Sequence, residues 1–125
     1  MSTAVATMTS LGNGPHRADT EVLRAQDTEL DLGARLLRVG GRCMPLPAKE
    51  FELLFVLLAH AGRVVPREQL LAAGWDNPCE VGKALEVYIR RLRQKIEVDP
   101  HHPTHIRTVR GIGYIFDREA LDWAS

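Results

Sequence analysis

Apolar residues recur with helical spacing in the middle of this chain of 125 residues, and a first helix is predicted there. Four positions follow the i, i+3, i+4, i+7 pattern that gathers side chains on one helix face, namely Phe51, Leu54, Phe55 and Leu58. Pro47 stands at the first helical position, where its missing N–H costs nothing, and Gly62 supplies a C-terminal stop. A second helix is predicted from Pro66 to about Trp75, before the turn at 76–78.

The third predicted helix, from about Val81 to Glu97, has two faces of opposite character. At about 100° per residue, one arc holds Leu85, Ile89, Leu92 and Ile96, with Tyr88 beside it. The opposite arc holds Lys83, Ala84, Val87, Arg90, Arg91 and Gln94. We therefore expect one buried face and one basic face that carries an exposed valine.

Short apolar runs separated by turn residues predict β-structure on both sides of the helices. Between Glu29 and Met44 the runs are interrupted by Gly40-Gly41, which is typical of an antiparallel hairpin. Near the C-terminus, the runs 106–109 and 114–116 flank a glycine-containing turn and predict a second hairpin. A small sheet, three helices with the basic one last, and a hairpin form the α+β fold of a winged helix-turn-helix.

The ends of the chain differ in composition from its middle. Residues 1–24 are rich in Ser, Thr, Ala and Gly without an apolar period, and are interpreted as a flexible leader. The winged-helix domain is assigned to residues 25–118 and a short tail to 119–125. No run reaches the roughly 18 apolar residues of a membrane span, and no signal pattern opens the chain. We expect a cytoplasmic protein without a membrane partner, and read Cys43 and Cys79 as ordinary thiols.

The charge balance at first argues against a nucleic-acid partner. Sixteen basic and sixteen acidic side chains give a net charge of zero, which excludes a uniformly basic coat protein and an acidic tail. The charges are nevertheless unevenly distributed, since residues 83–110 carry a net +4 and residues 1–31 a net −3. Neutrality is a cancellation between regions, and the third helix with the second hairpin is basic.

Four ordered blocks, at 46–54, 62–75, 87–96 and 106–114, carry a family likeness. They include LPAKEFELL, REQLL with Trp75, VYIRRLRQKI and IRTVRGIGY. From about Leu30 to Phe116 the chain resembles the DNA-binding effector domain of OmpR/PhoB-type response regulators. The resemblance implies an N-terminal sheet, a three-helix bundle and a C-terminal wing, with the third helix in the major groove. No receiver domain with a phospho-acceptor is found, so we expect a stand-alone effector domain.

The sequence departs from the family pattern at several positions. Pro47 and Pro66 stand where the family usually has a Ser or Thr cap, and Glu86 and Tyr88 stand where it usually has Asp and often His. The connection from Trp75 to Lys83 is slightly shorter than usual. In the family that connection often contacts RNA polymerase, which makes polymerase a second expected partner.

The basic helix offers both kinds of group that a major-groove helix needs. Arg91 is predicted to bond guanine bidentately, and Val87 to meet a thymine methyl group. Contacts to phosphates are predicted for Lys83, Arg90 and Arg93. The resemblance adds backbone contacts from Arg67, Trp75, Thr108 and Tyr114, and a minor-groove contact from Arg110. Trp75 could equally be a packing residue that closes the second helix.

Other chemistry finds little support in the sequence. His101, His102 and His105 lie in a Pro-flanked turn without a recognised zinc-ligand spacing, and Gly111-Ile112-Gly113 lacks the third glycine of a dinucleotide loop. No group of acid, base and nucleophile is apparent. We therefore expect no enzyme, metal or cofactor.

The prediction is a sequence-specific, double-strand DNA-binding transcriptional regulator, with two copies on tandem half-sites about one helical turn apart. A winged-helix module that docks on RNA polymerase or on a partner receiver without reading DNA is the alternative. A module of that kind would not need basic residues at Arg90, Arg91, Arg93 and Arg110 together.

Overall fold

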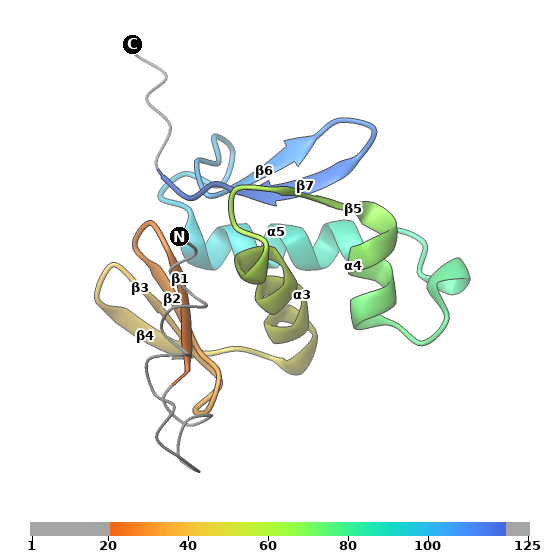
Figure 1. Ribbon diagram of the computed structural model, residues 1–125. Coiled ribbons are helices and arrows are strands. Elements are labelled where there is room, and N and C mark those ends of the chain that lie inside the picture. Colours follow the sequence, from red (N-terminus) through yellow and green to blue (C-terminus); the bar gives the residue numbers. More distant parts are fainter. Residues whose placement is uncertain (1–20, 120–125) are drawn as a thin grey trace.

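The structure, a computed structural model, describes residues 21–119 and consists of two small sheets packed around three helices (Figure 1). Most of the predicted leader and tail, residues 1–20 and 120–125, lies outside the described residues. The elements before the first helix are β1 (Val22–Ala25), β2 (Thr28–Asp31), β3 (Leu36–Val39) and β4 (Arg42–Pro45). They are followed by α3 (Ala48–Ala59), β5 (Val64–Pro66), α4 (Arg67–Gly74), the 3-10 helix η1 (Pro78–Glu80), α5 (Ala84–Ile96), β6 (Ile106–Val109) and β7 (Gly113–Phe116). None of the helices in residues 21–119 is long and apolar enough to cross a membrane.

The N-terminal sheet is antiparallel in the order β1-β2-β3-β4. The predicted hairpin is therefore confirmed as part of a larger sheet. Leu23, Leu30 and Leu37 pair side by side across three strands, and all three are buried. β1 begins at Val22, so the N-terminal sheet includes three residues, 22–24, that the sequence analysis assigns to the leader. A strand of four residues with one buried leucine leaves too short a pattern to detect in the sequence alone.

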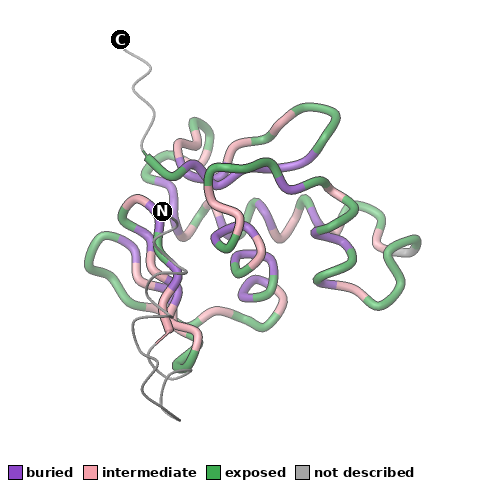
Figure 2. The backbone as a smooth tube through the Cα atoms, in the orientation of Figure 1, coloured by how far each residue is buried: buried purple, intermediate pink, exposed green. Residues whose placement is uncertain are grey.

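The first predicted helix is confirmed as α3, with one error in its buried face. Pro47 occupies the N-cap position and offers no side-chain hydrogen bond to the helix. Leu53 and Leu57 are fully buried, whereas Phe55, which was predicted on the apolar stripe, is 40% exposed. The stripe is rotated because α3 packs against α4, α5, β1 and β7. Burial follows those neighbours rather than the apolar spacing alone (Figure 2).

The third predicted helix is confirmed as α5, but it begins at Ala84 rather than near Val81. Gly82 adopts the left-handed region with φ +62°, which separates η1 from α5. The predicted apolar stripe is buried as expected at Leu85, Ile89, Leu92 and Ile96. Within the core, Lys95 of α5 forms an ion pair with Glu50 of α3, whose side chain is almost fully buried.

The C-terminal hairpin is confirmed, and a third strand joins it. In this sheet β7 pairs with β6 on one side and with β5 on the other. Gly113 makes the join possible, because a Cβ atom there would lie 2.0 Å from the carbonyl oxygen of Val65. β5 was not predicted, since three residues ending in proline give no strand pattern. The wing is thereby tied directly to the segment that leads into α4.

Candidate nucleic-acid interface

The outer face of α5 presents positive charge to solvent. Lys83, at the N-cap position, and Arg90 and Arg91 are exposed, while Val87 is half-buried rather than fully exposed. These three basic side chains make no hydrogen bond or ion pair with any of the residues that the structure describes. Arg91 lies over the ring of Tyr88, with 5.2 Å from its guanidinium carbon to the ring centroid. The helix is thus packed through its apolar stripe and carries exposed cations on its other side.

Arg67, the first residue of α4, is paired with α5. Its Nε donates to Glu86 Oε2 at 3.0 Å, and one terminal nitrogen donates to Glu86 Oε1 at 3.3 Å and to the Gly82 carbonyl oxygen at 3.2 Å. The hydrogen bonds from Arg67 lower the pKa of the Glu86 carboxyl group. Sequence reasoning missed this pairing, because the two residues are 19 positions apart and no local spacing indicates it.

Arg93 occupies the flank of α5 that faces the wing. Its Nε donates to the Ile106 carbonyl oxygen at 3.0 Å, and a terminal nitrogen donates to Thr108 Oγ1 at 2.9 Å. The guanidinium carbon lies 5.8 Å from the ring centroid of Tyr114. Burial of the half-buried guanidinium lowers the pKa of Arg93. This arginine therefore differs from the exposed cations on the same helix.

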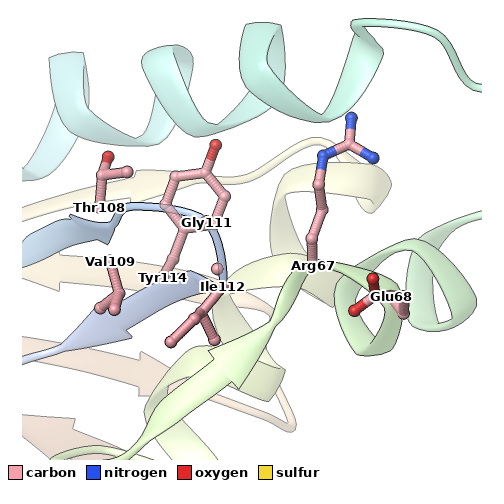
Figure 3. A pocket seen from close by; sticks show the side chains of 8 residues that line it. Arg67, Glu68, Thr108, Val109, Gly111, Ile112 and Tyr114 are labelled. Atoms are coloured by element: carbon pink, nitrogen blue, oxygen red, sulfur yellow. The ribbon is translucent and has the colours of Figure 1, made fainter.

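Three predicted contact residues meet in one pocket of about 240 Å³ between the start of α4 and the wing (Figure 3). The lining residues are Arg67, Glu68, Thr108, Val109, Gly111, Ile112, Gly113 and Tyr114. In Figure 3 the Tyr114 hydroxyl points toward α5, while most of the ring is buried, and burial raises the pKa of Tyr114. Arg110 is exposed in the turn between β6 and β7. The pocket thus adjoins the turn that carries Arg110.

Trp75 lies at the other end of α4, at its C-cap position. Its ring centroid is 5.9 Å from that of Tyr88, and Lys49 Nζ lies 4.8 Å from the Trp75 ring centroid. Lys49 also donates to the carbonyl oxygen of Gly74. These contacts give Trp75 a packing role between α3, α4 and α5, and leave part of its ring accessible.

The connection from α5 to the wing is organised by a buried carboxylate. Glu97 Oε1 and Oε2 accept hydrogen bonds from the backbone N–H groups of Thr104, His105 and Ile106 at 2.8–3.1 Å. His105 Nδ1 lies 2.9 Å from Glu97 Oε1, and its Nε2 lies 2.8 Å from Asp27 Oδ1. Among residues 21–119, no group of His, Cys, Asp and Glu is arranged to hold a metal ion. His105 is held through both ring nitrogens, between Glu97 and Asp27.

Comparisons with known proteins agree with this geometry. The chain is 44% identical over 99 residues to the sensory transduction protein RegX3 of Mycolicibacterium smegmatis. The aligned region covers 78% of this chain and 43% of that protein. The response regulator DrrB of Thermotoga maritima, described as an OmpR/PhoB homologue, superimposes with a TM-score of 0.69 and 36% identity, covering 77% of this chain and 44% of that one. The chain thus spans less than half the length of these two relatives.

A solved structure of an isolated domain matches over nearly its whole length. The DNA-binding domain of Klebsiella pneumoniae RstA, in complex with the RstA box, superimposes with a TM-score of 0.67 and 28% identity. The match covers 78% of this chain and 98% of that domain. The family model described as "Transcriptional regulatory protein, C terminal" matches residues 41–116. The chain belongs to this family of OmpR/PhoB-type winged-helix effector domains, which are domains of transcription regulators.

Proposed function

We propose that this chain binds double-stranded DNA sequence-specifically and regulates transcription. In this proposal α5 lies in the major groove and the turn between β6 and β7 reaches the minor groove. The observation that carries it is the exposed basic row of α5, at Lys83, Arg90 and Arg91, opposite a fully buried apolar stripe. A helix held in this way can bring cations to phosphates and one or two side chains to base edges.

The ten predicted residues take the following roles in the proposal. Arg91 and Val87 read bases, and Arg110 enters the minor groove. Lys83, Arg90, Arg67, Thr108 and Tyr114 meet phosphates, Trp75 does so with the accessible part of its ring, and Arg93 supports the interface. The RstA domain, which has the same fold, was solved with its DNA box, and this supports the proposal. Binding to chromosomal DNA implies that the protein acts in the cytoplasm, and no catalytic reaction is assigned to it.

Two partners complete the proposal. A second copy of the chain would occupy a tandem half-site about 10 base pairs away, which is one turn of DNA. RNA polymerase would meet the exposed connection between α4 and α5, where Asp76, Asn77, Pro78 and Cys79 all face solvent. The number of protein copies bound per duplex, measured by gel shift on one and two half-sites, tests the first partner.

A selection from randomised duplexes, followed by gel shifts with the selected site, tests DNA binding itself. The three cations assigned to phosphates, Lys83, Arg90 and Arg67, predict that affinity falls about fortyfold between about 50 and 200 mM salt. Arg91→Ala should relax the base preference at one position, at a cost of about 1–3 kcal/mol. Arg24→Ala is the matched control, because this arginine lies on β1 in an ion pair with Glu29. If no duplex were bound in a salt-sensitive way, the proposal would be overturned and the protein-docking module favoured.

A further inference from the structure

Arg93 is the basic residue of α5 that bonds the wing, although a contact to phosphate is the role first expected of it. Its two hydrogen bonds to Ile106 and Thr108 both end on β6. A guanidinium group presents its donors in a rigid planar fork, so two acceptors on one strand fix its orientation. An ammonium group carries the same charge but cannot reproduce this geometry.

These two hydrogen bonds are made to an edge strand of the sheet. In the order β5-β7-β6, β7 is paired on both sides, whereas β6 is an edge strand. Ile106, paired with Phe116, is buried at the base of the wing, but Thr108, paired with Tyr114, is exposed. Arg93 therefore bonds β6 at its buried base, through Ile106, and in its exposed half, through Thr108, two residues before Arg110.

We propose that Arg93 is a positioning residue for DNA recognition. It sets the position of the turn that carries Arg110 relative to the outer face of α5. The major-groove contacts of Arg91 and the minor-groove contact of Arg110 are then made by one rigid unit. This inference rests on the proposed function, since both contacts are contacts to DNA.

The test is a double-mutant cycle between Arg93→Lys and Arg110→Ala, measured as affinity for the selected duplex. Arg110→Ala in the wild-type background is expected to weaken binding about tenfold. In the Arg93→Lys background the wing is already displaced, so Arg110→Ala should add less than about twofold. Arg90→Lys is the matched control, because the exposed Arg90 side chain makes no hydrogen bond in the described part of the chain. In that background the full tenfold effect is expected.

The same cycle contains the outcome that would overturn the inference. If Arg93 served only as a phosphate contact, Arg93→Lys would keep its charge, and Arg110→Ala would cost the same tenfold in both backgrounds. The base preferences give an independent readout. Arg93→Lys should lose the preferences that Arg110→Ala loses and keep those that Arg91→Ala loses, and a uniform weakening of all sequences would contradict the positioning role.

A measurement without DNA separates failure of this inference from failure of the proposed function. Amide hydrogen exchange of Arg107 and Val109, whose N–H groups face β7 in the alternation of the ladder, should quicken about tenfold in Arg93→Lys, while the amides of Ile89 and Leu92 in α5 keep their rates. Unchanged exchange in the wing would overturn the positioning role even if DNA is bound. If exchange in the wing quickened but the protein bound no DNA, the hydrogen bonds of Arg93 would be confirmed as holding the wing. The role in DNA recognition would then fail together with the proposed function.

Discussion

His105 is held against Glu97 at the point where α5 leads into the wing, with 2.9 Å between His105 Nδ1 and Glu97 Oε1. The other ring nitrogen, Nε2, faces Asp27 in the turn between β1 and β2. Two carboxylates thus accept from one imidazole ring, an arrangement that favours the doubly protonated, cationic form. The N-terminal sheet, the end of α5 and the root of the wing meet at this side chain.

The charge on His105 should make stability depend on pH. Burial of the ring opposes the charge, but the hydrogen bonds to Glu97 and Asp27 outweigh it and raise the pKa of His105 above the usual 6.5. The folded state therefore binds this proton more tightly than the unfolded state does. The stabilisation is complete below pH 6.5, the ordinary pKa, and is lost as the pH rises through the raised pKa of the folded protein.

Urea unfolding at a series of pH values checks this prediction. The free energy of unfolding of the wild-type protein should decline above about pH 6.5, and in His105→Gln this component of the decline should vanish. His102→Gln is the control, since His102 is exposed and bonds only the exposed Asp99 in the described structure. Parallel curves for the wild-type protein and His105→Gln would contradict the assignment.

Replacing Lys95 should lower the free energy of unfolding, because Lys95 pairs with a buried carboxylate between α3 and α5. Lys95→Met leaves the Glu50 carboxylate, which is 1% exposed, without its cation, and we expect a loss of about 3 kcal/mol in stability. The double variant Glu50→Leu/Lys95→Met removes both charges and should recover most of that loss. Thermal or urea unfolding measures both, and a double variant no more stable than the single one would contradict the explanation.

Gly113→Ala should weaken the join between the wing and β5. The new Cβ would stand 2.0 Å from the Val65 carbonyl oxygen, so the strands must separate, at a cost of about 3 kcal/mol. Gly82→Ala is the control, because nothing lies within 4 Å of a Cβ there and only its positive φ is strained, at about 1–2 kcal/mol. A Gly113→Ala variant as stable as the wild-type protein would show that the close approach carries no cost.

Glu86→Gln should tighten DNA binding if the proposed function holds. The substitution removes a negative charge beside Arg67 and loosens the pair that occupies this guanidinium. Glu86 offsets part of the charge that Arg67 brings to its phosphate, so its removal predicts a salt slope steeper by up to about 0.9 and an affinity about threefold higher at low salt. Glu29→Gln, on the N-terminal sheet, controls for the change in net charge. Equal or weaker binding by Glu86→Gln would contradict a competition between Glu86 and phosphate.

The elements that were predicted correctly are those whose signal is local. The stripe of Leu85, Ile89, Leu92 and Ile96 has a helical period, and its burial followed from that period alone. β5 escaped prediction because its pairing with β7 involves residues about fifty positions further along the chain. Phe55 was placed in the core because apolar spacing does not tell which neighbours a helix will have.

The candidate interface also contains features that the sequence predicts and features that it does not. The exposure of Lys83, Arg90 and Arg91 could be read from the helical wheel. The partners of Arg67 and Arg93 could not, because Glu86, Ile106 and Thr108 are brought to them only by the packing of α4 and the wing against α5. A wheel gives the direction of a side chain, whereas a hydrogen-bond partner depends on the tertiary structure.

The length of the connection at 60–63 sets the register in which β5 pairs with β7. Gly62, inside this connection, donates its N–H to the Phe116 carbonyl oxygen at 2.8 Å, and Val64, just after it, pairs with Ile115, so the connection is tied to β7 at two points. Removing one residue would slide β5 by one position along β7 and exchange the buried Val65 for the exposed Val64. Insertions and deletions in relatives of this chain should therefore gather in the connections at 76–82 and 98–104, and spare the four residues that set the register of the wing.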